Sequence, residues 1–373
     1  MARIITSINN KGGVGKTSSC TTIGSLLGIL GYRCLIVDND FQSNATATFL
    51  NENDNIAGTV RDLFVTENIT RKDVEECILH TSYKNVDLIP ACPEHVDTDE
   101  YLYSLPKEEV YTKLKKALQH IQDDYDYIMI DTHPDLYGVT KNALCCSDYV
   151  MTPVGADGYS FQGTAPITNS ILKISDELNP GLSFLGAFMT SVDTRTSAYK
   201  NYYSFYESQL GDDFLHVAIR RDSSIAAVPS WLLPLPYLLG DRDFRSTSKW
   251  KGIYDYIDLM YDVGMISEDD YMVIRGIFEI ADGKLLIELS NEPNVRIKSV
   301  HLAAGVRDDF QNEYVKENLP HYKDLVRTLN ENESLKTAVK EGLITVMNED
   351  RLIKLYTRKL KFPYVKIKSL KED

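Results

Sequence analysis

The segment of residues 9–17, NNKGGVGKT, has the residue types that bind phosphate. Glycines let backbone N–H groups close around phosphate oxygens, and a helix that begins here adds a favourable dipole for an anion. Lys16 would neutralise the terminal phosphates, and the Thr17 hydroxyl would take a coordination position on Mg²⁺. We therefore predict a nucleotide site whose loop consists of Lys11, Gly12, Gly13, Val14, Gly15, Lys16, Thr17 and Ser18.

Three aspartates stand where carboxylates could serve that metal. Asp38 and Asp40 lie directly behind the apolar run of residues 34–37, and Asp131 ends the apolar run of residues 128–130. An Asp-x-Asp pair alone is also typical of a turn. Behind a phosphate loop, however, carboxylates at strand ends are typical of Mg²⁺ sites, and Asp131 is placed like an acid that holds the metal through water.

An alternation of strands and helices is expected to position these residues. Residues 2–8 are apolar and β-prone, residues 18–30 repeat small and apolar side chains at helical spacing, and residues 34–37 form a second apolar run. Further short apolar runs, at 85–90, 125–131, 149–154 and 182–190, alternate with helical stretches at 110–122, 163–177 and 250–261. Strands buried on both faces have this pattern, so we predict an α/β fold with a doubly wound, mostly parallel sheet.

The loop resembles the deviant phosphate loop of the ParA/MinD-type ATPases, because it has asparagine at position 10 and an additional lysine, Lys11. The resemblance implies a P-loop NTPase domain that forms a homodimer around ATP and Mg²⁺. Lys11 would cross the dimer interface and stabilise charge on the transferring phosphoryl group of the partner's nucleotide. The segment behind residue 37 is similar too, which implies that Asp38 orders the Mg²⁺ waters and that Asp40 positions or activates the attacking water.

Two segments depart from the family pattern. After Asp131 the family usually has two prolines, whereas this chain has Thr132-His133-Pro134. His133 could sense the terminal phosphate, shuttle a proton or simply replace a switch proline. In relatives a Pro-Arg-Asn segment approaches the adenine, and the matching residues here are Arg220-Arg221-Asp222, so the resemblance makes Asp222 a candidate adenine contact.

The resemblance covers residues 1–262, and a different module is expected in residues 263–373. Residues 277–279 and 285–288 flank a turn signal at 281–284 and are expected to form a hairpin. Residues 295–302 are expected to add a strand and residues 308–342 to be helical, before a basic tail closes the chain. We therefore predict an accessory α+β domain behind the ATPase domain.

Composition limits the partners and the compartment. The net charge of −14 argues against a surface that binds nucleic acid all over, although residues 351–368 hold seven Lys or Arg and no acid. The six cysteines lack CxxC spacing and indicate buried thiols in a reducing compartment. No apolar run approaches the roughly 20 residues of a membrane span, so cytoplasmic residence is expected.

Several functions remain open. The leading one is a partition or cargo-positioning ATPase whose ATP dimer binds non-specific DNA and whose slow hydrolysis is stimulated by a partner protein. A MinD-like ATPase could instead use residues 351–362 as an amphipathic membrane-surface helix, and a mobile element or defence system could use residues 263–373 for partner recognition. Iron–sulfur reductases need paired cysteines, but no cysteine lies between Cys92 and Cys145. The candidate DNA contacts are Arg220, Arg221, Arg245, Lys249, Lys251, Lys359 and Lys361.

Overall fold

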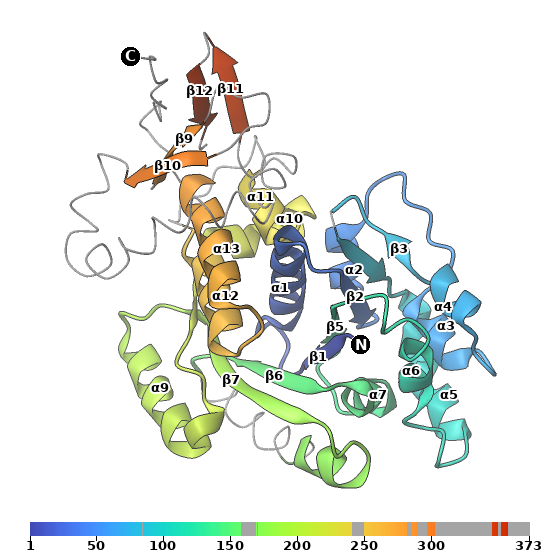
Figure 1. Ribbon diagram of the computed structural model, residues 1–373. Coiled ribbons are helices and arrows are strands. Elements are labelled where there is room, and N and C mark those ends of the chain that lie inside the picture. The colour runs from blue at the N-terminus through green and yellow to red at the C-terminus, as the bar shows by residue number, and fades with distance from the viewer. Residues whose placement is uncertain are drawn as a thin grey trace.

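A central sheet organises the chain (Figure 1). The computed structural model describes residues 1–83, 85–157, 169, 171–240 and 250–281, and the four strands 285–289, 297–302, 345–349 and 352–356. The sheet has eight strands in the order β3-β4-β2-β5-β1-β6-β7-β8, and its neighbours are parallel except for β3 with β4. The strands are β1 (Arg3–Ser7), β2 (Cys34–Asn39), β3 (Leu79–His80), β4 (Val86–Ile89), β5 (Tyr127–Thr132), β6 (Tyr149–Val154), β7 (Ser183–Val192) and β8 (Ile219–Arg220).

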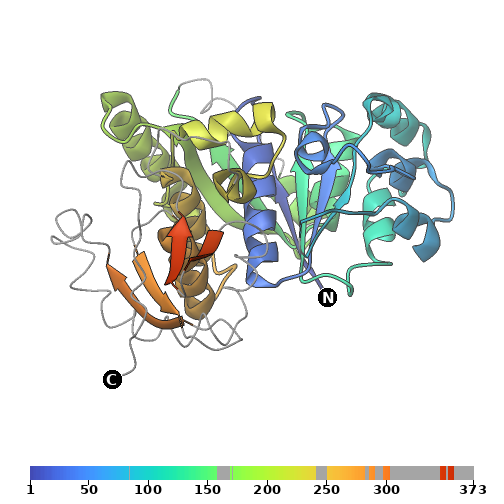
Figure 2. The same cartoon turned by 90° about the horizontal axis from the view of Figure 1, so that it is seen from above.

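Helices cover both faces of the sheet, as Figure 2 shows from above. Successive side chains of a strand point to opposite faces, so Ile5 of β1 packs in one core and Ile4 in the other. The first core contains side chains of α1 (Lys16–Leu30), α2 (Asn44–Phe49), α11 (Leu235–Gly240), α12 (Lys251–Asp262) and α13 (Glu268–Ala281). The second contains side chains of α3 (Val60–Val65), α4 (Arg71–Glu76), α5 (Thr98–Ser104), α6 (Lys113–Leu118) and α7 (Gly138–Cys146). This confirms the predicted doubly wound α/β architecture.

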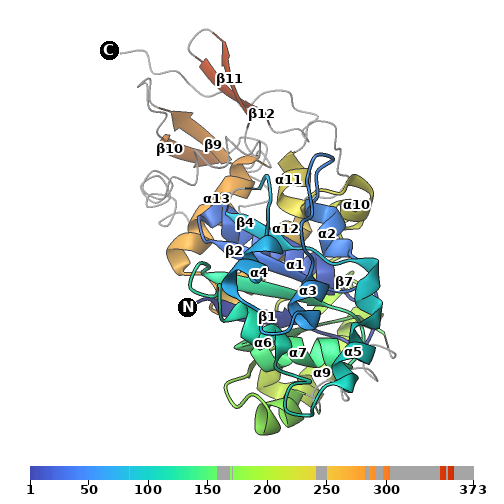
Figure 3. The same cartoon turned by 90° about the vertical axis from the view of Figure 1, so that its right-hand side faces the viewer.

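The remaining described elements lie around this frame (Figure 3). They include η1 (Pro93–Asp97), α9 (Ser197–Leu210), η2 (Gly211–Asp213) and α10 (Ser223–Trp231). The described residues contain no helix with both the length and the apolar character needed to cross a membrane.

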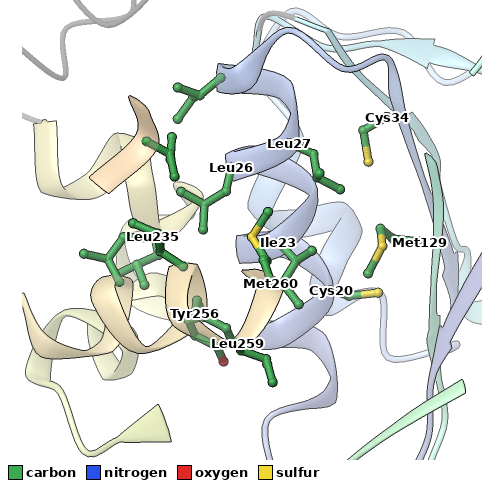
Figure 4. Close-up of a cluster of buried hydrophobic side chains, with 14 of the residues drawn as sticks. Cys20, Ile23, Leu26, Leu27, Cys34, Met129, Leu235, Tyr256, Leu259 and Met260 are labelled. Atoms are coloured by element: carbon green, nitrogen blue, oxygen red, sulfur yellow. The ribbon is translucent and has the colours of Figure 1, made fainter. Parts of the chain in front are cut away.

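Helix α1, which follows the glycine-rich loop, is buried along nearly its whole length. Its residues Ile23, Leu26 and Leu27 are fully covered, and side chains of α11 and α12 such as Leu235 and Met260 lie against it (Figure 4). A helix that is apolar on most sides needs neighbours on most sides, which here include the sheet and the helices α2, α11, α12 and α13. The position of the loop is therefore fixed by the core of the protein.

Helix α13 corrects the prediction of a hairpin around residues 281–284. Residues 277–279 belong to this helix and are not a strand. Its residues Val273, Ile274, Ile277 and Phe278 are buried in the same core as α1. Their i, i+1, i+4, i+5 spacing is helical, whereas the sequence prediction considered only the short apolar run next to the turn signal. The division after residue 262 stays a prediction, and α13 lies beyond it while packing in the same core as α1.

The described strands beyond α13 form two antiparallel pairs. Strand β9 (Leu285–Leu289) pairs with β10 (Ile297–Leu302), which confirms the strand expected near residues 295–302. Strand β11 (Thr345–Glu349) pairs with β12 (Leu352–Tyr356). The amphipathic helix considered for residues 351–362 is therefore wrong for 352–356, which form a strand. The helices expected at 308–342 lie outside the described residues.

Candidate functional site

A cavity of about 760 Å³ opens where the strands of the parallel sheet end. Residues that follow β1, β2 and β5 line it, together with the end of β7, the end of β8 and one side of α10. In open α/β sheets, ligands bind beyond the carboxyl ends of the strands. The lining includes Gly12, Gly13, Val14, Gly15, Lys16, Thr17, Ser18, Asp40, His133 and Asp222, so the structure brings most of the predicted site residues together.

The glycine-rich loop has the backbone geometry that its sequence predicts. Gly13 and Gly15 adopt φ of 74° and 93°, a left-handed region that favours glycine, and α1 begins directly after Gly15. The side chain of Asn9, just before the loop glycines, holds the loop in place. Asn9 accepts a hydrogen bond from the Lys11 N–H at 2.9 Å and donates one to the Pro153 carbonyl at 2.7 Å. A rigid loop keeps its N–H groups oriented for an anion before the anion arrives.

Lys16 lies at the base of the cavity. Its side chain is almost fully covered, and its ammonium group donates a hydrogen bond of 3.3 Å to the Lys11 carbonyl. Burial lowers the pKa of Lys16, while the nearby carboxylates of Asp131, Asp40 and Asp135 oppose that shift. A buried cation with several carboxylates nearby is suited to neutralise terminal phosphates, as predicted.

Asp131 is the residue whose surroundings fit a divalent cation. It is fully buried, and neither carboxylate oxygen has a hydrogen-bond partner within the described chain. Burial raises the pKa of Asp131 to about 8, and the Thr17 hydroxyl beside it opposes the shift. Carboxylate and hydroxyl oxygens are the donors that Mg²⁺ prefers. Thr17 and Asp131 could therefore hold this metal, as the sequence predicts.

Asp38 and Asp40 lie together but make different contacts. Asp38 Oδ2 accepts hydrogen bonds from the backbone N–H and the hydroxyl of Thr46, both at 2.7 Å, so Asp38 fastens α2 to the end of β2. Burial raises the pKa of Asp38 to about 6. Asp40 lines the cavity and accepts a hydrogen bond from the Gln42 N–H at 2.9 Å. Of the two carboxylates, Asp40 is the one placed to contact a water in the cavity.

Lys11 and Lys16 lie in different environments. The Lys11 ammonium group forms an ion pair with Asp157, with N–O distances of 2.6 and 2.7 Å. Both side chains are partly exposed, at 35% for Lys11 and 42% for Asp157. The loop therefore presents one lysine inside the cavity and a second one at the surface.

The two departures from the family pattern make specific contacts. His133 lines the cavity, and its ring stacks on that of Phe41. Asp222 caps α10 by accepting a hydrogen bond from the Ser224 N–H, and its other oxygen accepts one from the Gly252 N–H. An adenine contact of Asp222 stays a prediction.

Sequence reasoning missed several residues that support the site. Thr190 donates a hydrogen bond of 2.6 Å to the Val14 carbonyl, which fastens the loop to β7. Asn9 is buried beneath the loop, and Asp157 holds Lys11 from a segment 146 positions away. The polar residue directly before the loop was a local signal for Asn9. No local pattern identifies Asp157 or Thr190, because each meets the loop only after the sheet has formed.

Comparison with known proteins finds relatives of the chain among the Soj and ParA proteins. The model of a family described as AAA domain matches residues 2–184. The sporulation initiation inhibitor protein Soj of Bacillus subtilis is 32% identical over 263 residues, which is 70% of this chain and 98% of Soj. The chromosome partitioning protein ParA of Myxococcus xanthus is 28% identical over 235 residues, 63% of this chain and 81% of that protein.

Solved structures show the same fold. Cobyrinic acid a,c-diamide synthase from Mycobacterium smegmatis with bound ATP analogue and magnesium has a TM-score of 0.54 and 25% identity, over 62% of this chain and 93% of that one. A plasmid partition protein from Borrelia burgdorferi bound to AMPPNP has a TM-score of 0.57 and 23% identity, over 71% of this chain and all of that one.

Proposed function

Since the chain belongs to the ParA/MinD-type P-loop ATPases, the family of Soj and ParA, we propose that it is an ATP-dependent dimerising switch in DNA partition or cargo positioning. Family membership supports nucleotide hydrolysis and a partition role in general terms. The proposal adds three specific points. The dimer forms with Lys11 at the partner's nucleotide, the dimer binds DNA, and a partner protein stimulates hydrolysis.

ATP and Mg²⁺ are the cofactors of this site, and the residues present fit both. The loop N–H groups and Lys16 suit phosphate oxygens, and the buried carboxylate of Asp131 with the Thr17 hydroxyl suits a hard cation. When bound, Mg²⁺ neutralises charge that develops on the phosphate oxygens. We assign Asp40 to the attacking water, because it lines the cavity. Asp38 holds the segment behind β2 through its hydrogen bonds to Thr46. We also propose that Asp38 orders water molecules bound to Mg²⁺.

The observation that carries the proposal is the separation of the two loop lysines. Lys16 is buried in the cavity, and Lys11 lies at the surface in a partly exposed ion pair with Asp157. A surface ion pair is worth about 0–1 kcal/mol, so Lys11 can exchange Asp157 for another anion at small cost. A nucleotide bound to a second copy of the chain is such an anion.

Mixing two inactive variants tests this assignment. Lys11→Ala and Asp40→Ala should each hydrolyse ATP very slowly. If Lys11 acts in the partner's site and Asp40 in its own, each mixed dimer regains one complete site. Random exchange at equal concentrations should then restore about a quarter of the unmodified rate, since half of the dimers are mixed and each has one site of two. Phosphate release is the measurement, and a mixture of Lys16→Ala with Asp40→Ala is the control, because Lys16 serves its own site.

No recovery in the first mixture, or full activity of either single variant, would contradict the assignment. Recovery in the control mixture would also contradict it, because Lys16 would then act across the dimer.

DNA binding is expected of the ATP-bound dimer and is tested separately. Among the candidate contacts within the described residues, Arg220 is held by the buried carboxylate of Asp255, whereas Lys251 is exposed at the start of α12. The other described candidate, Arg221, lines the cavity. The affinity of the dimer for duplex DNA should fall at least about tenfold between roughly 50 and 200 mM salt, because counterions are released on binding.

Lys251→Ala should reduce the slope of log affinity against log salt by about one, whereas Lys72→Ala on the distant α4 should leave the slope unchanged.

Solution mass with ADP and with a slowly hydrolysed ATP analogue shows whether a dimer forms. A dimer that binds anionic vesicles and no DNA would contradict the partition role.

A further inference from the structure

We propose that Phe41 and His133 form an aromatic clasp that joins the segment of Asp40 to the segment of Asp131, so that both carboxylates keep their relative positions during ATP hydrolysis. The proposal rests on the proposed ATPase function and adds two positioning residues to it. Neither ring needs to contact the nucleotide for this role.

The two rings come from neighbouring strands. Strands β2 and β5 are paired, and their last paired residues are Asn39 and Thr132. His133 directly follows Thr132, and Phe41 lies two residues after Asn39. Their ring centroids are 4.3 Å apart and their planes differ by 28°, which is a stacked arrangement. Such a pair favours contact by about two- to tenfold in an equilibrium. The stack thus adds a side-chain contact between the two segments beyond the point where the strand pairing ends, next to the cavity.

The histidine ring is anchored within its own segment. His133 Nδ1 lies 2.7 Å from Asp135 Oδ2, and the other oxygen of Asp135 accepts hydrogen bonds from the Thr140 hydroxyl at 3.0 Å and the Tyr137 N–H at 3.1 Å. This network connects the ring to the first turns of α7. A displacement of the loop behind β5 would therefore carry the His133 ring with it.

The phenylalanine segment is anchored in the same way. The Asp40 carboxylate accepts a hydrogen bond from the Gln42 N–H, and the Asp40 carbonyl accepts one of 2.8 Å from the Ser43 N–H. Phe41 lies inside this turn, so a shift of its backbone would change the position of Asp40. Each ring thus belongs to the segment of one carboxylate. Because the two rings are stacked, a movement of one segment would disturb the other.

The geometry points to ring shape as the property that matters at position 133. One nitrogen of His133 is occupied by Asp135, and the face of the ring contacts Phe41. A phenylalanine at 133 keeps the face that contacts Phe41 and keeps its backbone link to β5, and it loses the contact with Asp135. His133→Phe should therefore restore most of the turnover that His133→Ala loses.

A double-mutant cycle on kcat tests the clasp. Phe41→Ala and His133→Ala should each lower kcat about three- to tenfold with little change in KM for ATP, and the double variant should be no slower than the slower single variant. His133→Phe should return kcat to within about threefold of the unmodified protein. If the two single effects multiply in the double variant, or if His133→Phe is as slow as His133→Ala, the clasp is wrong.

A second measurement does not depend on catalysis. Hydrogen exchange of the amides at residues 41–46 should become faster in His133→Ala, and exchange at 133–140 should become faster in Phe41→Ala, because each ring protects the opposite segment. A protein that hydrolyses no ATP but shows both changes would remove the proposed function and keep the clasp. Unchanged exchange in the opposite segment would overturn the clasp even in an active enzyme.

The pair Tyr261 and Tyr271 serves as the matched control. Their ring centroids are 4.8 Å apart, and they join α12 to α13 outside the cavity lining. Alanine at either position should lower thermal stability without coupling in kcat. Coupling in kcat of the same size there would show that any lost aromatic contact slows turnover, and would overturn a specific role for Phe41 and His133.

Discussion

Asp131→Asn is expected to stabilise the nucleotide-free protein and to lower ATP turnover at least about 100-fold, which is the usual cost of removing one charge-stabilising group from a site of this kind. The carboxylate is fully buried without a hydrogen-bond partner in the described chain. Replacing it by a neutral amide of the same shape removes a buried charge and should raise the free energy of unfolding by about 1–3 kcal/mol. Turnover falls because the amide cannot neutralise a metal.

The stabilisation should depend on pH in a defined direction. Burial raises the pKa of Asp131 from 3.8 to about 8, so the folded state holds the proton more tightly than the unfolded state. Ionisation therefore costs the unmodified protein stability as the pH rises from about 4 to about 8, while the amide variant has no such loss. The difference in melting temperature between the two proteins should grow from about pH 5 to about pH 8.

Asp38→Asn provides the matched control, with the opposite sign. Asp38 is also buried and its pKa is raised to about 6, less than that of Asp131. Both of its oxygens accept hydrogen bonds, one from the Asp40 N–H and the other from the N–H and the hydroxyl of Thr46, and we expect the loss of these bonds to outweigh the removal of the charge. An amide there loses an acceptor and should lower the melting temperature. Thermal melts without nucleotide, together with phosphate release assays, measure both effects. A lower melting temperature for Asp131→Asn would show that this carboxylate stabilises the fold and would remove the argument that it is reserved for a metal.

Removal of α13 is expected to have the largest effect on stability. A chain that ends at residue 262 lacks the buried side chains of Val273, Ile274, Ile277 and Phe278 and uncovers the surface of α1 beneath them. Each such side chain contributes about 1.5–3 kcal/mol by burial, so the loss is comparable with the about 5–15 kcal/mol stability of a typical protein. The shortened chain should be insoluble or should melt at a much lower temperature.

A chain that ends at residue 281 keeps this helix and is the control. Polar contacts at α13 support the same boundary, since Tyr32 donates a hydrogen bond of 2.8 Å to Asp270 and Arg275 pairs with Asp258 at 2.6 Å. This longer chain should melt cooperatively and bind a fluorescent ATP analogue. Equal melting temperatures for the two shortened chains would contradict the role of α13 and would support a boundary after residue 262.

The parts of the fold that depend on local pattern could be predicted from the sequence. Six strands of the central sheet appear as short apolar runs, and the NNKGGVGKT loop with Asp131 gives the site its chemistry. Helix α13 was missed because a short apolar run does not distinguish strand from helix, and a turn signal next to it favoured a hairpin. Asp157 and Thr190 were missed for another reason. They meet the loop through tertiary contacts, about which local spacing holds no information.

The two edges of the central sheet are unusually short. Strand β3 at one edge and β8 at the other have two residues each, so each offers few unpaired backbone N–H and C=O groups. A strand of another chain could form only a few backbone hydrogen bonds there, whereas long flat edges are common starting points for aggregation. The protein should therefore stay dispersed when many copies crowd onto one surface, and it should recover as separate molecules when they are released.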